Sequence, residues 1–311
     1  MLPINKLYIY LNNLTIHYKF LYKPTTEPNI EKRIINSYFV SPEINDAIFS
    51  LSYKTSLCIE SNFIKYTIQI YHNSKNIDKI INHIIICIGF MSNFSNNIKH
   101  ICINYYLSNN KKYFKKNATV NEINSGFSNM KTNTITVYRK EEYMKVTLHE
   151  LIHIFHLDRI KDNSKLLKFY QNKYNFHLDA VNLYEAYTEF WAILFHTYLY
   201  TKYTNNTFIQ YSRNIKKEIQ HSKMQYIKLI NHISRDINKY TNVFAYYILK
   251  YELLILMNQI IQLCFYKQKL VLNNPKVQRI NQLLLHESNK ILPKLLKNRL
   301  NKSMRMSILE L

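Results

Sequence analysis

The chain has 311 residues, of which 47% are hydrophobic, so it can bury a sizeable core as one large domain or as two lobes. The four cysteines show no CxxC spacing, which excludes a zinc finger of the usual pattern. The formal net charge of +22 leaves a nucleic-acid partner possible, but the lysines are scattered and favour a solvated basic surface.

The first half of the chain mixes strand and helix patterns. Segments rich in β-branched and aromatic residues, or with apolar and polar residues in alternation, predict strands. A stripe of isoleucines every three or four residues predicts a helix over residues 75–91, and residues 124–128 form a predicted turn. The predicted strands are residues 6–10, 15–22, 63–71, 99–107 and 134–138.

The second half is almost entirely helical in pattern, and Pro293 should kink or split the last helix. We therefore expect an α+β protein, with a mixed lobe and a small sheet in residues 1–158 and a helical lobe in residues 159–311. The predicted helices after residue 158 are 164–174, 180–203, 208–237, 242–266 and 277–299.

The most informative motif is HELIH, which begins at His149 inside a predicted helix over residues 141–158. His149 and His153 are four residues apart, so both imidazoles lie on one helix face and can reach one metal ion. Glu150 lies about 100° around the helix, where its carboxylate can act as general base on a water. The alternative is a buried helix with two hydrogen-bonded histidines.

A catalytic zinc site needs a third protein ligand. His156 lies about 10 Å further along the helix axis, too far to share an ion with His149. A third histidine six residues after His153 is absent, because that position is Arg159. Asp158 is an acidic alternative at the end of the helix.

Two glutamates in the later apolar helix are better candidates. Glu185 and Glu189 are four residues apart, and a glutamate is rarely buried without a partner. We assign Glu185 as the third metal ligand and Glu189 as the acceptor that orients His149. The two roles could be exchanged, or both carboxylates could pair with lysines.

The combination of HExxH with Glu185 and Glu189 on a later helix resembles the gluzincin metallopeptidases, the thermolysin-like group. The interval between His153 and Glu185 is longer here than in thermolysin. The flanking sequences resemble metallopeptidase-like proteins encoded by large DNA viruses. These resemblances imply a zincin-like fold, a bound Zn²⁺ and a peptide or protein substrate. The segments concerned are 126–128, 135–158, 184–192 and 242–254.

The resulting expectation is a zinc peptidase in which Glu150 is the general base. Tyr246 and Tyr247 are candidate donors to the oxyanion, although either could be a core residue. Residues 134–138 are the expected sheet edge for an extended peptide. His196, His221 and His232 are weaker candidates for a supporting or surface role.

Two other functions stay open. One is a catalytically inactive zincin-fold protein that binds or supports a partner. The other is a nucleic-acid-binding protein that uses a basic run near the end of the chain. That run consists of Lys294, Lys297, Arg299, Lys302 and Arg305.

The cysteines and residues 1–6 indicate the cellular compartment in which we expect the protein. Cys87 follows three isoleucines, a context typical of a buried free thiol, and residues 1–6 lack the pattern of a secretory signal. The best apolar run, residues 84–91, is far shorter than the ~18 residues that span a bilayer. We expect an intracellular protein in a reducing compartment, which for a viral protein means the host cytoplasm or the virion.

Overall fold

The protein is α+β, as expected, and it divides into two compact units. The sheet unit comprises Leu14–Lys112 and Asn124–Phe155, and the helical unit comprises Met1–Asn13, Tyr113–Ile123 and His156–Leu311. The computed structural model describes residues 2–30, 35–95, 97–114, 119–232, 237–238, 241–291 and 302–310, without the side chain of His232.

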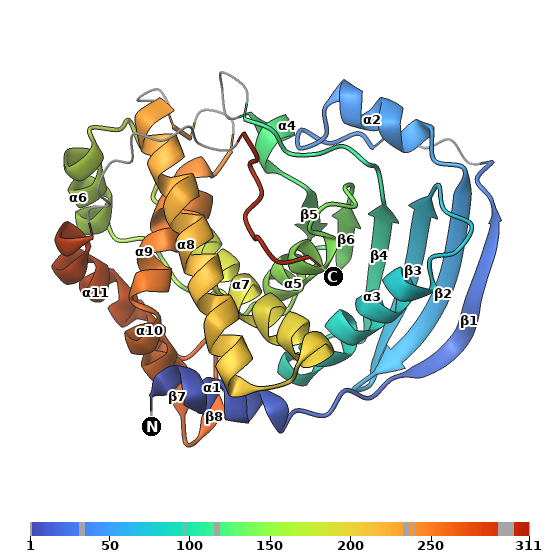
Figure 1. The fold of residues 1–311 in the computed structure, drawn as a ribbon, viewed down its shortest axis with the longest axis horizontal. Helices are drawn as coiled ribbons and strands as arrows, with labels where there is room; N and C mark the ends of the chain where they lie inside the picture. Colours follow the sequence, from blue (N-terminus) through green and yellow to red (C-terminus); the bar gives the residue numbers. More distant parts are fainter. Residues whose placement is uncertain are drawn as a thin grey trace. The chain divides into compact units, whose positions relative to one another are not determined.

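The sheet unit contains a six-stranded mixed sheet in the order β1-β2-β3-β4-β6-β5 (Figure 1). The β3–β4 and β4–β6 pairs are parallel, and the others are antiparallel. The strands are β1 (Lys19–Pro28), β2 (Tyr53–Ser61), β3 (Ile64–His72), β4 (His100–Tyr106), β5 (Gly126–Asn129) and β6 (Thr134–Val137). The helices are α2 (Pro42–Phe49), α3 (Asp78–Met91), the 3-10 turn η1 (Ser92–Phe94) and α5 (Tyr143–Ile154).

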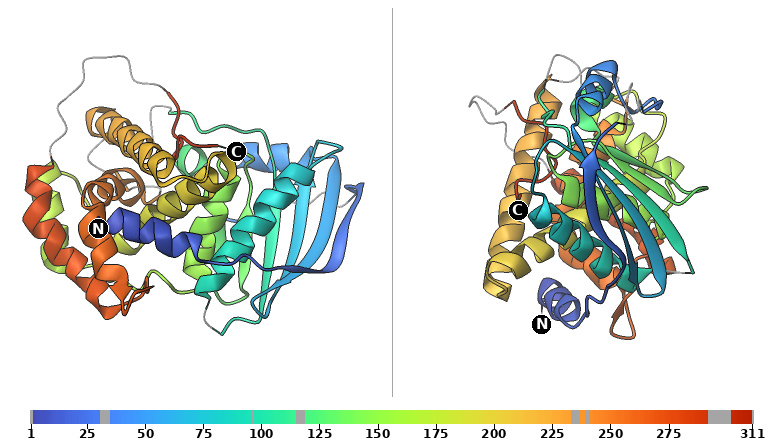
Figure 2. Two further views of the ribbon diagram at one scale, coloured as in Figure 1. Left: turned by 60° about the horizontal axis from the view of Figure 1, so that its bottom comes forward. Right: turned by 90° about the vertical axis from the view of Figure 1, so that its right-hand side faces the viewer.

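Helices pack against both faces of this sheet. On one face lie α3 and α5 (Figures 1 and 2), and Tyr105 of β4 is hydrogen-bonded to Thr147 of α5, 2.9 Å between the hydroxyl oxygens. On the other face, Tyr71 and Tyr106 stack with ring centres 4.7 Å apart, in a hydrophobic cluster that includes Ile44 of α2. Neighbouring residues of one strand point to opposite faces, so Tyr105 packs on the α5 side of the sheet and Tyr106 on the α2 side.

Several predictions for the first half are confirmed, but the first predicted strand is wrong. The predicted strands at 63–71 and 99–107 correspond to β3 and β4, and the predicted helix at 75–91 corresponds to α3. Residues 6–10, predicted as a strand, belong to helix α1 (Pro3–Asn12), which packs on α10 within the helical unit. Its buried residues Ile4, Leu7, Tyr8 and Leu11 have the spacing of one helix face.

The predicted sheet edge is also corrected. Residues 134–138 do contain a strand, β6, but β6 lies between β4 and β5, so the strand at this edge of the sheet is β5. Residues 124–128, predicted as a turn, contain the start of β5, which pairs with β6 from Gly126 onward. A four-residue strand that includes a glycine gives too little alternation to be recognised from sequence.

The predicted helices at 164–174, 180–203 and 208–237 correspond to α-helices of the helical unit at 164–174, 183–204 and 208–232. Residues 277–299 were expected to form one helix, but their described part, 277–291, is an eight-residue α-helix between two 3-10 turns. Residues 242–266 are a six-residue π-helix, two α-helices and a β-strand rather than one helix. Pro293 lies outside the described residues. The remaining elements are α4 (Val120–Ile123), α6 (Ser164–Tyr174), α7 (Leu183–Thr204), α8 (Phe208–His232), η2 (Phe244–Leu249), α9 (Lys250–Ile255), α10 (Met257–Cys264), β7 (Phe265–Tyr266), β8 (Lys269–Leu270), η3 (Pro275–Arg279), α11 (Ile280–Glu287) and η4 (Ser288–Lys290).

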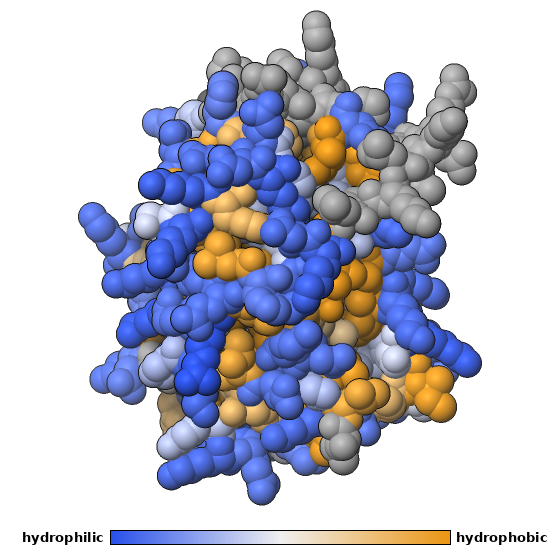
Figure 3. Space-filling view, turned by 90° about the vertical axis from the view of Figure 1, so that its left-hand side faces the viewer, coloured by the Kyte–Doolittle hydropathy of each residue, from blue (hydrophilic) through white to orange (hydrophobic). Residues whose placement is uncertain are grey.

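The surface of the helical unit on the side of α6, α10 and α11 is mainly hydrophilic, with hydrophobic patches between the polar side chains (Figure 3). Among the described helices, none has both the length and the apolar character needed to cross a bilayer. All four cysteines are free, and three of them are buried.

Candidate metal centre

Helix α5, which carries the HExxH motif, is buried along its whole length. It starts after Glu142, a residue with a φ of 61°, whose carboxylate accepts a hydrogen bond from the buried Lys112 ammonium at 2.9 Å. It ends at Ile154, because His156 has a φ of 52° and turns the chain out of the helix. The helix is therefore shorter at both ends than the predicted 141–158, and the motif occupies its second half.

The two histidines of the motif face one another. The Nε2 atoms of His149 and His153 are 3.0 Å apart, and the rings meet edge-on with an interplanar angle of 75°. Both side chains are buried. As a hydrogen bond, this contact requires one Nε2 to be protonated and the other not. The same separation suits two nitrogen ligands of one ion.

Glu150 lies beside Gly126 of the edge strand β5. A Cβ atom added to Gly126 would be 3.6 Å from a carboxylate oxygen of Glu150, 2.6 Å from Val146 Cγ1 and 2.9 Å from the main-chain oxygen of Thr136. The strand and the helix therefore approach closely only because residue 126 has no side chain. The absence of a side chain at Gly126 lets β5 reach the general-base candidate.

Replacing Gly126 by alanine should destabilise the sheet unit by about 1–3 kcal/mol, the usual cost of overpacking a tight contact. The Thr136 oxygen belongs to the paired strand β6, and the β-branched Val146 has few rotamers, so neither can yield easily. Urea unfolding measures the change, with Ser128→Ala on the same strand as control. An unchanged urea midpoint for Gly126→Ala would show that the contact is not tight.

Glu185 is placed by the first turn of α7. Asn182, with a φ of 55°, precedes this helix, and the Asp162 carboxylate accepts hydrogen bonds from the main-chain N–H groups of Val181, Asn182 and Leu183 at 2.7 to 3.0 Å. A carboxylate at this end of a helix satisfies free N–H groups and stabilises the helix dipole. Asp162 thereby fixes the turn that carries Glu185.

Two tyrosine hydroxyls contact the Glu185 carboxylate. Tyr246 donates a hydrogen bond to Glu185 Oε2 at 3.2 Å. Burial, together with the charge of Glu185 and a hydrogen bond to it, raises the pKa of Tyr184. The raised pKa keeps the Tyr184 phenol protonated beside the carboxylate. Glu185 is 9% exposed.

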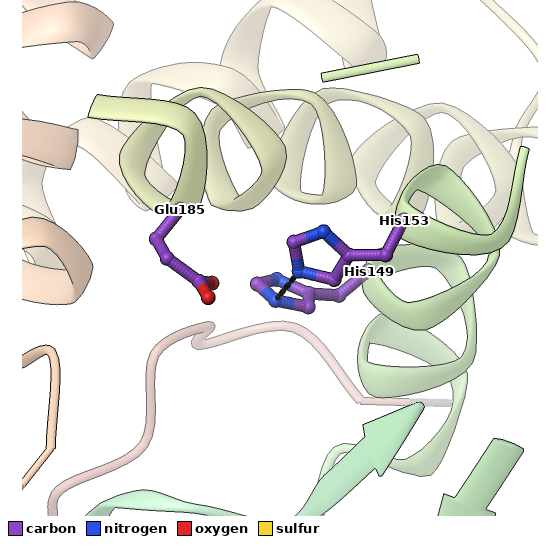
Figure 4. Close-up of side chains that lie close together, drawn as sticks. All are labelled: His149, His153 and Glu185. Carbon is purple, nitrogen blue, oxygen red and sulfur yellow. Dashed lines mark hydrogen bonds between the residues drawn. The ribbon is translucent and has the colours of Figure 1, made fainter. Parts of the chain in front are cut away.

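The ligand atoms of His149, His153 and Glu185 all lie within 4.8 Å of one another. Figure 4 shows the two imidazoles on α5 and the carboxylate at the start of α7. In the described part of the chain, no other group of three histidine, cysteine, aspartate or glutamate residues meets this condition. Glu189 is fully buried one turn further along α7 and is not in this group.

Tyr246 and Tyr247 lie in the π-helix η2 and point to different partners. Tyr246 contacts Glu185, whereas the Tyr247 hydroxyl donates to the main-chain oxygen of Met304 at 2.7 Å. A π-helix inserts an extra residue into a helical turn and is frequent at functional sites. The sequence singled out both tyrosines but gave no indication of this irregular turn.

The other histidine and acidic candidates lie elsewhere. Asp158 accepts a 3.4 Å hydrogen bond from Thr188, His221 donates to the main-chain oxygen of Arg305, and His196 lies 3.4 Å from the Ser307 hydroxyl. His156 is exposed. Sequence reasoning missed Asp162 and Tyr184. An aspartate at residue 162 indicates a cap for the helix that starts at Ser164, but its carboxylate binds N–H groups about 20 residues later, at the start of α7.

Of the basic run proposed for nucleic-acid binding, residues 294, 297 and 299 lie outside the described residues. Arg305 pairs with Glu310 at 3.1 Å.

No protein family, no curated protein and no solved structure matches this chain. The function is therefore inferred from the residues of the candidate centre and their geometry.

Proposed function

We propose that the protein is a zinc-dependent peptidase whose metal ligands are His149, His153 and Glu185. The observation that carries this proposal is the group of two buried imidazoles and one carboxylate, with Glu150 adjacent in sequence to the first histidine. The mixed sheet, with a short antiparallel edge strand packed against the HExxH helix, supports a zincin-like, gluzincin-type architecture.

The donor set fits zinc. Two nitrogens and one carboxylate oxygen are ligands that Zn²⁺ prefers, and three protein ligands leave one position open. Two nitrogens at ~2.05 Å from a tetrahedral ion are about 3.3 Å apart. The observed separation of 3.0 Å between the two Nε2 atoms needs only a small adjustment to reach that value.

In this proposal, each residue of the centre has a separate role in peptide hydrolysis. Bound zinc supplies a Lewis acid that polarises the scissile carbonyl and acidifies the attacking water. Glu150 accepts the proton of that water and returns it to the leaving amine. Tyr246 and Tyr184 both contact the Glu185 carboxylate and are proposed as phenolic donors for a developing oxyanion. Glu189 is the proposed acceptor that orients His149.

The proposed substrate is an extended peptide. The edge strand β5 is paired with β6 on one side only within the sheet, so its outer main-chain groups can pair with an added strand. Such a strand would run past Gly126, which lies against Glu150. This places the edge-strand role on β5 instead of the predicted residues 134–138.

Zinc content tests the proposed ligand set. We expect one zinc per chain in the purified protein by elemental analysis, and loss of that zinc in His153→Ala and Glu185→Ala. Losing one of three ligands removes a large part of the binding free energy. Glu189→Ala should keep its zinc, although second-sphere changes weaken affinity by about 10–100-fold.

The matched control is His156→Ala, because this exposed histidine is three residues from His153 and outside the ligand group. It should retain zinc at the wild-type level. A folded wild-type chain that holds no zinc when purified without chelator would overturn the proposal. Zinc retained in Glu185→Ala but lost in Glu189→Ala would exchange the roles of the two glutamates.

A further inference from the structure

Residues 302–310 form an extended segment of the helical unit, drawn in dark red in Figure 1, that is held through its main chain. Side chains of α8, η2 and α9 donate hydrogen bonds to four successive carbonyl oxygens. The pairs are Ser303 with Gln225 (3.1 Å) and Lys228, Met304 with Tyr247 (2.7 Å), Arg305 with Gln225 and His221 (3.0 Å each), and Met306 with Lys250 (3.0 Å).

The N–H groups of the same segment are bound by one buried carboxylate. Glu218 of α8 accepts hydrogen bonds from the main-chain N–H of Ile308 (3.2 Å) and of Leu309 (3.1 Å), and from the Ser307 hydroxyl (2.6 Å). Burial raises the pKa of Glu218, and these hydrogen bonds oppose the rise. The helical unit therefore provides donors for the carbonyls and an acceptor for the amides of one extended chain.

The side chains of the segment follow a simple pattern. Met304, Met306 and Leu309 are buried, whereas Ile308 is 48% exposed. Ile308 lines a pocket of about 370 Å³ whose other walls come from α8. Long flexible side chains such as methionine fill irregular cavities, so this surface would accept other apolar side chains of similar size.

We infer that the surface formed by α8, η2 and α9 is a binding site for an extended polypeptide, occupied here by residues 302–310 as an intramolecular ligand. Contacts to the main chain give affinity that is independent of sequence, and the buried positions at 304, 306 and 309 select apolar side chains. The chemical class of ligand is an unfolded or extended peptide with apolar residues at that spacing.

This binding site is linked to the candidate metal centre through η2. Adjacent residues of the π-helix contact the two places: Tyr246 donates to Glu185, and Tyr247 donates to Met304. A peptide that displaces residues 302–310 would therefore contact η2, the π-helix whose Tyr246 is hydrogen-bonded to the proposed metal ligand Glu185. The relevance of this link rests on the peptidase function proposed above, whereas peptide binding itself does not.

A labelled peptide with the sequence of residues 302–310 tests the binding site on the full chain. In the wild type, the tethered segment competes at an effective concentration on the order of millimolar, so the added peptide should bind weakly. Met304→Asp places a charge in a fully buried position and should release the segment. We expect the peptide to bind this variant about tenfold or more tightly than the wild type.

Met130→Asp is the matched control, because it makes the same substitution at a methionine that is 49% exposed in the other unit. It should bind the peptide as weakly as the wild type. In the Met304→Asp background, Lys228→Met removes one of the two donors to the Ser303 carbonyl and should weaken peptide binding. Equal binding by folded Met304→Asp and wild type would overturn the inference.

If Met304→Asp does not melt cooperatively, hydrogen exchange of the wild type decides the question. Isotope-labelled peptide in excess over the effective concentration of the tethered segment, on the order of millimolar, should speed amide exchange within residues 302–310, and unchanged exchange would overturn the inference. These readouts need neither zinc nor turnover. If the zinc-loaded wild type hydrolyses no peptide while Met304→Asp still binds the labelled peptide, only the peptidase function is overturned. If the wild type hydrolyses peptides while Met304→Asp binds the labelled peptide no better than the wild type, only the binding site is overturned.

Discussion

Replacing Glu150 by glutamine should abolish peptide hydrolysis while leaving the zinc content unchanged. Glutamine has the size of glutamate but cannot accept the proton of the attacking water. Loss of a general base costs about 10²–10⁴-fold in rate. The three proposed ligands are untouched, so elemental analysis should still give one zinc per chain. The loss should appear mainly in kcat, because the proton moves in the chemical step.

The control for this variant is Glu60→Gln, on β2 of the same unit, which should hydrolyse peptide at the wild-type rate. Urea unfolding of both variants shows whether the sheet unit is intact. Hydrolysis by Glu150→Gln at the wild-type rate would exclude Glu150 as the base. Loss of both zinc and hydrolysis would instead show that Glu150 supports the ligands.

The parts of the fold that depend on local periodicity could be predicted from the sequence. The alternation in β3 and the isoleucine stripe in α3 each describe contacts with one neighbouring layer. The aromatic and β-branched residues of α1 predict a strand, and this prediction is wrong because Pro3 and the spacing of Ile4, Leu7 and Leu11 favour a helix. The order of the strands depends on pairing between distant segments, so no local pattern identified β5 as the edge.

The candidate site divides in the same way. His149, Glu150 and His153 lie within five residues, and helix geometry alone predicts that the two imidazoles meet. Glu185 was chosen because a carboxylate in an apolar helix requires a partner. The same argument applies to Glu218 and Glu252, which are fully buried and take their partners from the 302–310 segment and from α6 and η4. The local sequence shows that each of these carboxylates needs a partner, but the partner comes from a distant segment and cannot be predicted from it.

Glu252 of α9 is a fully buried carboxylate whose partners come from distant segments, and replacing it should strongly destabilise the helical unit. Its carboxylate accepts hydrogen bonds from three hydroxyls and one ammonium and is fully buried. Burial, and then the Glu252 charge, raise the pKa of Tyr170 and Tyr174, so both remain donors. The four donors are Tyr170, Tyr174 at 2.6 Å, Lys173 at 2.6 Å and Ser288 at 2.6 Å.

Glu252→Leu should therefore destabilise the helical unit by about 3–5 kcal/mol, since it leaves the Lys173 ammonium buried without its counter-charge. Glu252→Gln keeps an acceptor and should cost less. Adding Lys173→Met to Glu252→Leu removes the stranded charge and should recover part of the loss, which urea unfolding of the four proteins in this double-mutant cycle measures. The control is Glu287→Leu, a carboxylate in exposed pairs with His286 and Lys290, for which we expect a much smaller change. Equal destabilisation by Glu252→Leu and Glu287→Leu would contradict this account, because burial of the charge is the only cause it invokes.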